Sequence, residues 1–110
     1  MKIYNFTMVQ GDTFIFGINI NGLESDLSSA YFSVKKNYTD ESYTLQKSLN
    51  NGIAKNEDGS YNIKVNPIDT ENVEAGKYLY DVQIGIENDV FTILKGTLNI
   101  EQGVTEMWES

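Results

Sequence analysis

Apolar and polar residues alternate with a period of two along most of the chain. Successive side chains of a strand point to opposite faces, so each alternating run has one face that can be buried. The residues expected on the buried faces are Phe14, Phe16, Ile18, Ile20, Ala30, Phe32, Val34, Tyr43, Leu45, Leu49, Tyr61, Ile63, Val65, Tyr78, Tyr80, Val82, Ile84, Ile86, Val90, Leu94, Leu98 and Ile100. With one further run from Tyr4 to Val9, the pattern predicts about seven strands.

The connections between these runs are short and contain residues that favour turns. Asn21-Gly22, Asn51-Gly52 and Asp58-Gly59 all accept positive φ, and Glu57–Ser60 is typical of a hairpin tip. No helical pattern of 10 to 15 residues separates the strands, which favours an all-β fold over alternating strands and helices. The expected architecture is an immunoglobulin-like antiparallel β-sandwich over residues 1–103, followed by a tail at 104–110.

One segment, Pro67 to Gly76, departs from the alternation and predicts a short helical crossover near residues 69–74. Asp69 is a suitable N-cap, and Gly76 can end the helical turn. Ile68 and Val73 have the spacing of a hydrophobic staple across the first turn.

Tyr78 follows this crossover. In immunoglobulin-like sandwiches a tyrosine near this point anchors the corner between the two sheets. We therefore expect Ile68, Asp69, Val73, Gly76 and Tyr78 to form a structural corner and not a reactive site.

The residue types needed for most catalysis are missing. The chain has no histidine and no cysteine, which excludes imidazole acid–base catalysis, thiolate nucleophiles and disulfides. The adjacent acidic pairs lie in predicted turns, where charged residues are usually solvated. The Asn56–Gly59 segment is similar to part of a calcium-binding loop, but an alignment with Gly59 at loop position 6 places Ala54 and Val65 where the loop needs Asp and Glu. We expect no enzyme activity, no metal and no cofactor.

The net charge of −8 argues against partners that are themselves anionic. Nucleic acids and acidic membrane surfaces are bound through clustered Lys and Arg, and here the acidic residues are scattered between apolar positions. The N-terminal residues lack the apolar stretch of a signal peptide, and no window approaches a membrane span.

Five apolar residues are outward or unassigned in the strand pattern and are candidates for an interaction surface: Ile15, Phe91, Ile93, Met107 and Trp108. The alternative is that one or more of them pack under loops. Tyr31 and Tyr38 also fall outside the buried faces. Together with Phe91 and Trp108 they are candidates for carbohydrate binding, since sugar rings stack on exposed aromatic faces.

Several segments, spread in order over nearly the whole chain, are similar in sequence to a known family of domains. They are Gln10–Phe14, Asp26–Lys36, Asp69-Thr70, Ala75–Ile84, Val90–Ile100 and Gly103–Thr105. Through them the chain resembles small immunoglobulin-like domains of tailed phages and prophages of Gram-positive bacteria, including N-terminal modules of baseplate upper proteins and tail-fibre-like proteins.

The resemblance implies a non-enzymatic structural or assembly protein of the baseplate, tail or neck. Its partners would be other virion proteins or copies of itself, and it would reside in the host cytoplasm before joining the virion. The alternative function is a carbohydrate-binding or adhesin-like module that recognises a bacterial surface glycan. A concave surface with two or more exposed aromatics would favour the glycan; an apolar patch or a free strand edge would favour assembly.

Overall fold

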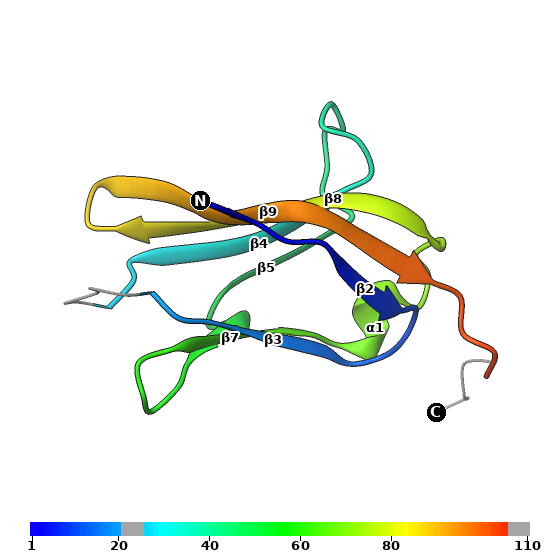
Figure 1. The fold of residues 1–110 in the computed structure, drawn as a ribbon, viewed down its shortest axis with the longest axis horizontal. Coiled ribbons are helices and arrows are strands. Elements are labelled where there is room, and N and C mark those ends of the chain that lie inside the picture. The colour runs from blue at the N-terminus through cyan, green and yellow to red at the C-terminus, as the bar shows by residue number, and fades with distance from the viewer. Residues whose placement is uncertain (21–25, 106–110) are drawn as a thin grey trace.

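The fold is all-β, as the alternation predicts. A computed structural model describes residues 1–20 and 26–105, and Figure 1 shows the arrangement of its elements. The elements are β1 (Lys2–Ile3), β2 (Phe6–Val9), β3 (Phe14–Ile18), β4 (Ser29–Lys35), β5 (Leu45–Leu49), β6 (Gly52–Lys55), β7 (Tyr61–Val65), α1 (Pro67–Thr70), β8 (Gly76–Ile86) and β9 (Asp89–Glu101).

The nine strands form one mixed sheet with the order β1-β9-β8-β4-β5-β6-β7-β3, and β2 also pairs with β9. The expectation of a purely antiparallel arrangement is wrong, because β1 and β2 run parallel to β9 and β5 runs parallel to β6. The sheet curls into a half-barrel. Figure 1 shows β4, β8 and β9 in one layer, with β3 and β7 in the layer that faces it.

The predicted hairpin in the middle of the chain is confirmed. β6 and β7 pair antiparallel, with Lys55 opposite Tyr61. The backbone N–H of Asn56 donates to the carbonyl of Ser60 at 2.7 Å, and Gly59 has a φ of 91°. A positive φ at this position is accessible to glycine without steric strain.

The expected strand from Tyr4 to Val9 begins later, at Phe6, and a further short strand, β1, precedes it; the segment between them crosses Gly96. The Tyr4 N–H donates to the carbonyl of Lys95, and the Thr97 N–H donates to the side-chain oxygen of Asn5 at 3.0 Å. A Cβ on Gly96 would collide with the Tyr4 carbonyl. Glycine is therefore needed at this point for the N-terminal segment to lie against β9.

The core lies between the two layers and follows the predicted faces of β4, β7 and most of β8. Its buried apolar residues are Met8, Leu27, Ala30, Phe32, Val34, Leu45, Ile53, Tyr61, Ile63, Val65, Tyr78, Tyr80, Val82, Ile84, Leu94, Leu98 and Ile100. Phe16 of β3 contacts Phe32 of β4 with 5.4 Å between ring centroids. This edge-on contact joins the two layers directly.

A bulge in β9 explains why the predicted burial of Val90 is wrong. Val82 pairs with Leu94, but Gln83 pairs with Thr92, so Ile93 is the extra residue. The bulge reverses which side chains point inward. Val90 is 61% exposed, whereas Leu94 on the other side of the bulge keeps its predicted burial.

The short helical crossover before β8 is present, but its first residues differ from the prediction. The N-cap is Asn66, and Asp69 lies in the first turn, where its carboxylate accepts the Asn66 backbone N–H at 2.7 Å. Pro67 suits the first helical position because its ring fixes φ and needs no N–H donor there. The helix therefore covers Pro67–Thr70 and not 69–74, and Asp69 is not the cap.

The predicted staple and helix stop are also wrong. Ile68 is 72% exposed, so it cannot pack against Val73, although Val73 itself contacts the core. The helix ends at Thr70, and Gly76 is instead the first residue of β8. The Tyr78 hydroxyl donates to the carbonyl of Glu74 at 2.7 Å, a bond from the start of β8 back to the crossover.

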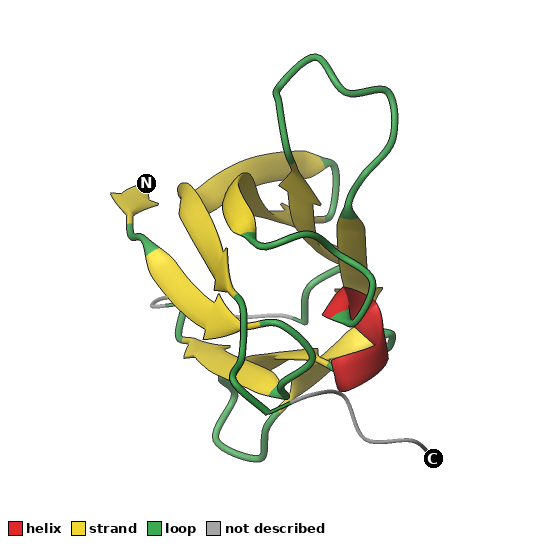
Figure 2. Cartoon of the chain, turned by 90° about the vertical axis from the view of Figure 1, so that its right-hand side faces the viewer, coloured by secondary structure: helices red, strands yellow, loops and turns green. Residues whose placement is uncertain are grey.

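The crossover is held in place by the loop after β2. The Gln10 side-chain amide donates to the carbonyls of Glu71 and Val73, at 3.1 and 2.7 Å. The Gly11 N–H donates at 2.9 Å to the hydroxyl of Thr70, which is fully buried. Figure 2 shows α1 beside the strands of the two layers, at one end of the molecule.

Candidate binding surfaces

Across residues 1–20 and 26–105, no group of three or more His, Cys, Asp or Glu side chains is placed to hold a metal ion. In the same part of the chain, no helix is long and apolar enough to cross a bilayer. Two surfaces of the molecule have distinct chemistry.

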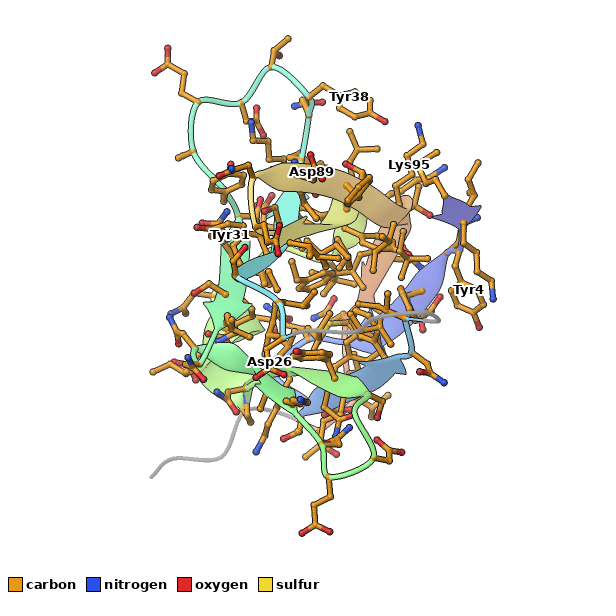
Figure 3. The ribbon with its side chains drawn as sticks, turned by 90° about the vertical axis from the view of Figure 1, so that its left-hand side faces the viewer. Tyr4, Asp26, Tyr31, Tyr38, Asp89 and Lys95 are labelled. Carbon is orange, nitrogen blue, oxygen red and sulfur yellow. The ribbon has the colours of Figure 1, made fainter. Side chains whose placement is uncertain are left out.

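The first surface is a hollow on the outer face of β4, β5, β8 and β9, which we call the tyrosine hollow. It has a volume of about 610 Å³ and is lined by Met1, Tyr31, Ser33, Lys35, Tyr38, Tyr43, Gln46, Leu79, Tyr80, Asp81, Gln83, Thr92 and Lys95. Three of these tyrosines are exposed: Tyr31 on β4, and Tyr38 and Tyr43 on the loop that leads to β5. Figure 3 shows Tyr38 on this loop, which projects beyond the sheet.

Strand register builds the floor of the tyrosine hollow from rows of polar side chains. One row crosses four strands, because Ser33 pairs with Gln46 on one side and Asp81 on the other, and Asp81 pairs with Lys95. The Gln46 amide donates to the Ser33 hydroxyl at 3.0 Å. Cross-strand partners share a face, so the whole row points away from the core.

A second row contains Tyr31, Gln83 and Thr92 in the same way. Lys35, two residues along β4 from Ser33, lies with its ammonium 5.1 Å from the centre of the Tyr43 ring. This distance is typical of a cation–π contact. The hollow therefore combines exposed rings, hydrogen-bonding groups and charge.

The charge in the tyrosine hollow differs from that of the whole chain. Burial raises the pKa of Asp81, and the nearby Lys35 charge partly opposes this effect. Within the described residues the ion pairs are Lys47–Asp69 and Lys55–Asp26, so Lys35 and Lys95 have no carboxylate at ion-pair distance. Two lysines against one aspartate make the hollow a basic region on a chain of net charge −8.

No protein-family model matches this chain, and no curated protein matches it.

The second surface is the free edge of β9 from Asp89 to Ile93, which we call the β9 edge. β8 pairs along one side of this segment. On the other side, β1 pairs with Leu94 and Lys95 only, so among the described strands none covers residues 89–93. Unpaired N–H and C=O groups of such an edge can pair with another strand.

Apolar side chains accompany the β9 edge. Val90 and Phe91 are exposed, and so are Met1, which precedes β1, and Ile3, which is the second residue of β1. Phe91 is the register partner of the buried Ile84, so it faces the same side as the core. It also lines a surface hollow together with Ile20, Ile86 and Ile93.

The structure brings together only part of the predicted interaction surface. Phe91 and Ile93 both line this hollow, and Ile93 is partly buried against the core. Ile15 is exposed on β3, in the opposite layer, and its register partner is Lys64. Met107 and Trp108 lie outside the described residues.

The prediction from the sequence does not identify two residues: Tyr43, which lines the tyrosine hollow, and Lys47, which lies in the interior. Tyr43 was expected to be buried with Leu45, but it precedes β5 and is exposed. Lys47 was not singled out, yet it is buried and pairs with Asp69 at 2.7 Å. The alternation does indicate that Lys47 is buried, because a period of two places it on the same face as Leu45 and Leu49.

Proposed function

We propose that the chain is a non-enzymatic, immunoglobulin-like structural domain of a tailed phage or prophage, and that it assembles through the β9 edge. The proposed assembly is supported by the free backbone edge of residues 89–93, where Val90 and Phe91 are exposed. The phage setting is supported by the sequence resemblance alone.

The strand pairing supports the immunoglobulin-like part of the proposal. One group of strands is β2, β9, β8, β4 and β5, and the facing group is β3, β7 and β6. Among the described strands, the two groups pair with each other through two residue pairs between β5 and β6. A helical crossover before β8 and a tyrosine bonded to the backbone upstream are both features of immunoglobulin-like sandwiches.

The partner we propose for the β9 edge is a second copy of the chain. Two antiparallel copies of residues 89–93 would each supply the strand that the other lacks, around a two-fold axis. Asp89 is the one charged residue of the segment, so the contact largely avoids the repulsion expected between two chains of net charge −8. Val90 and Phe91 would supply apolar contact area at its centre.

The experiment is multi-angle light scattering of the full chain from 1 to 200 μM, at about 0.15 M salt to screen the net charge. We expect the mass to rise from one to two chains, and the Phe91→Lys variant to remain a single chain. A matched control is Ile68→Lys, which adds the same charge at an exposed apolar residue of α1 and should associate like the parent chain.

Two further variants test the other predicted contacts. Ile15→Lys leaves the mass unchanged if β3 takes no part, and a chain shortened to end at Thr105 does the same if Met107 and Trp108 take no part. A parent chain that stays a single chain up to 200 μM, or a Phe91→Lys variant that still doubles its mass, would overturn the β9 edge as the contact.

A further inference from the structure

The tyrosine hollow has a different composition from the β9 edge and is expected to bind a different class of partner. A protein interface usually has an apolar centre that excludes water. The hollow instead places polar side chains in its centre, in the row Gln46, Ser33, Asp81 and Lys95. A ligand that covers this row must carry many hydrogen-bonding groups of its own.

The hydrogen-bonding groups of the hollow suit a hydroxyl-rich ligand. The amides of Gln46 and Gln83 each offer a donor and an acceptor, and the hydroxyls of Ser33 and Thr92 can act in both ways. Sugar hydroxyls likewise donate and accept, so they can complement this mixture without leaving groups unpaired.

The exposed tyrosines supply the other half of saccharide recognition. The rings of Tyr31, Tyr38 and Tyr43 line the hollow and are exposed, although the Lys35 ammonium lies over the ring of Tyr43. An aromatic face contacts the C–H face of a sugar ring, while the phenol hydroxyl remains free to bond. The hydroxyl of Tyr80 is not available in this way, because it donates to the Tyr4 carbonyl at 2.6 Å.

The charge of the hollow selects among saccharides. Lys35 and Lys95 line it, and among the described residues neither has a carboxylate at ion-pair distance. Asp81, the cross-strand partner of Lys95, is the one acidic residue of the lining. We propose that the tyrosine hollow is a saccharide site that prefers an acidic glycan, with carboxylates of the sugar facing Lys35 and Lys95 and sugar rings on Tyr31 and its neighbouring tyrosines. The hollow shares Thr92 with the β9 edge, but its exposed tyrosines and its two lysines lie outside residues 89–93.

The test compares two forms of one saccharide by isothermal titration calorimetry on the full chain. The probes are hexagalacturonate and its fully methyl-esterified form, which has the same rings without the negative charges. We expect the acidic form to bind about fivefold more tightly or better, and its advantage to shrink at about 0.5 M salt, because exposed ion pairs are modest and screened.

Variants separate the contribution of charge from that of ring stacking. Lys35→Gln and Lys95→Gln should each weaken the acidic form about two- to fivefold and leave the ester unchanged. Asp81→Asn should strengthen binding of the acidic form, because it removes the opposing charge. Tyr31→Ala should weaken both forms, and Lys64→Gln, on the outer face of β7, is the control that should change neither.

Each result bears on the proposal. Tighter binding of the acidic form, with the expected pattern of variants, supports it. Equal binding of both forms overturns the preference for acidic glycans, and binding of neither form overturns the saccharide site. If no saccharide binds and Tyr31→Ala instead changes the mass in light scattering, the hollow is a protein contact and the proposal is also overturned.

Discussion

The ammonium of Lys47 lies 2.7 Å from the carboxylate of Asp69, and this ion pair ties β5 to the crossover helix. Both side chains are largely buried. The same carboxylate oxygen also accepts the backbone N–H of Asn66, so Asp69 holds the start of the helix and its neighbouring strand together. The contact gives the crossover a fixed position against the sheet.

Removing one member of this pair should destabilise the fold strongly. We expect Asp69→Asn or Lys47→Met to lower the free energy of unfolding by about 3 kcal/mol, because either change leaves a largely buried charge without its partner. The measurement is urea unfolding at pH 7. The matched control is Asp26→Asn, which removes the exposed pair with Lys55 and should change stability by less than about 1 kcal/mol. Equal losses for the two pairs would contradict the structural role of Lys47.

The corner hydrogen bond of Tyr78 should contribute measurably to stability. Tyr78→Phe removes the bond to the Glu74 carbonyl but keeps the ring in the core, and we expect a loss of about 1 kcal/mol. Tyr38→Phe is the control, since Tyr38 is 79% exposed and should change stability little. A Tyr78→Phe variant as stable as the parent chain would show that the Tyr78 hydroxyl does not stabilise the corner.

Stability should fall in strong alkali through Tyr80. Burial raises its pKa from 10.0 to about 12. A phenol whose pKa is higher in the folded state binds its proton more tightly there, so its contribution is complete below pH 10 and is lost as the pH rises from 10 to 12. Urea unfolding over this range should show a shallower decline for Tyr80→Phe than for the parent chain. Parallel declines would contradict this assignment.

Gly96→Ala should displace the N-terminal segment. Because the added Cβ meets the Tyr4 carbonyl, we expect a loss of about 1–3 kcal/mol and faster hydrogen exchange at the Tyr4 amide. Gly17→Ala is a milder control, because its Cβ would meet the Asn62 side chain at 3.3 Å, which can move. Unchanged exchange at Tyr4 in Gly96→Ala would show that the crossing tolerates a side chain.

Alternation along the chain was enough to predict an all-β fold, the hairpin from β6 to β7 and most of the core. It succeeded for Phe32, Ile63 and Val82 because a strand of regular pleat sends every second side chain to the same face. The anchor role of Tyr78 is predicted from its position after the crossover, as in immunoglobulin-like sandwiches, and its hydroxyl does bond to the crossover.

Tertiary structure decided the features that break this regularity. The bulge at Ile93 reverses the inward face of β9, and no local pattern marks it because both faces there carry apolar residues. The parallel pairing of β1 and β2 with β9 depends on contacts nearly a whole chain apart in sequence. The tyrosine hollow likewise exists only because register aligns Gln46, Ser33, Asp81 and Lys95 across four strands, whereas a sequence period describes one strand at a time.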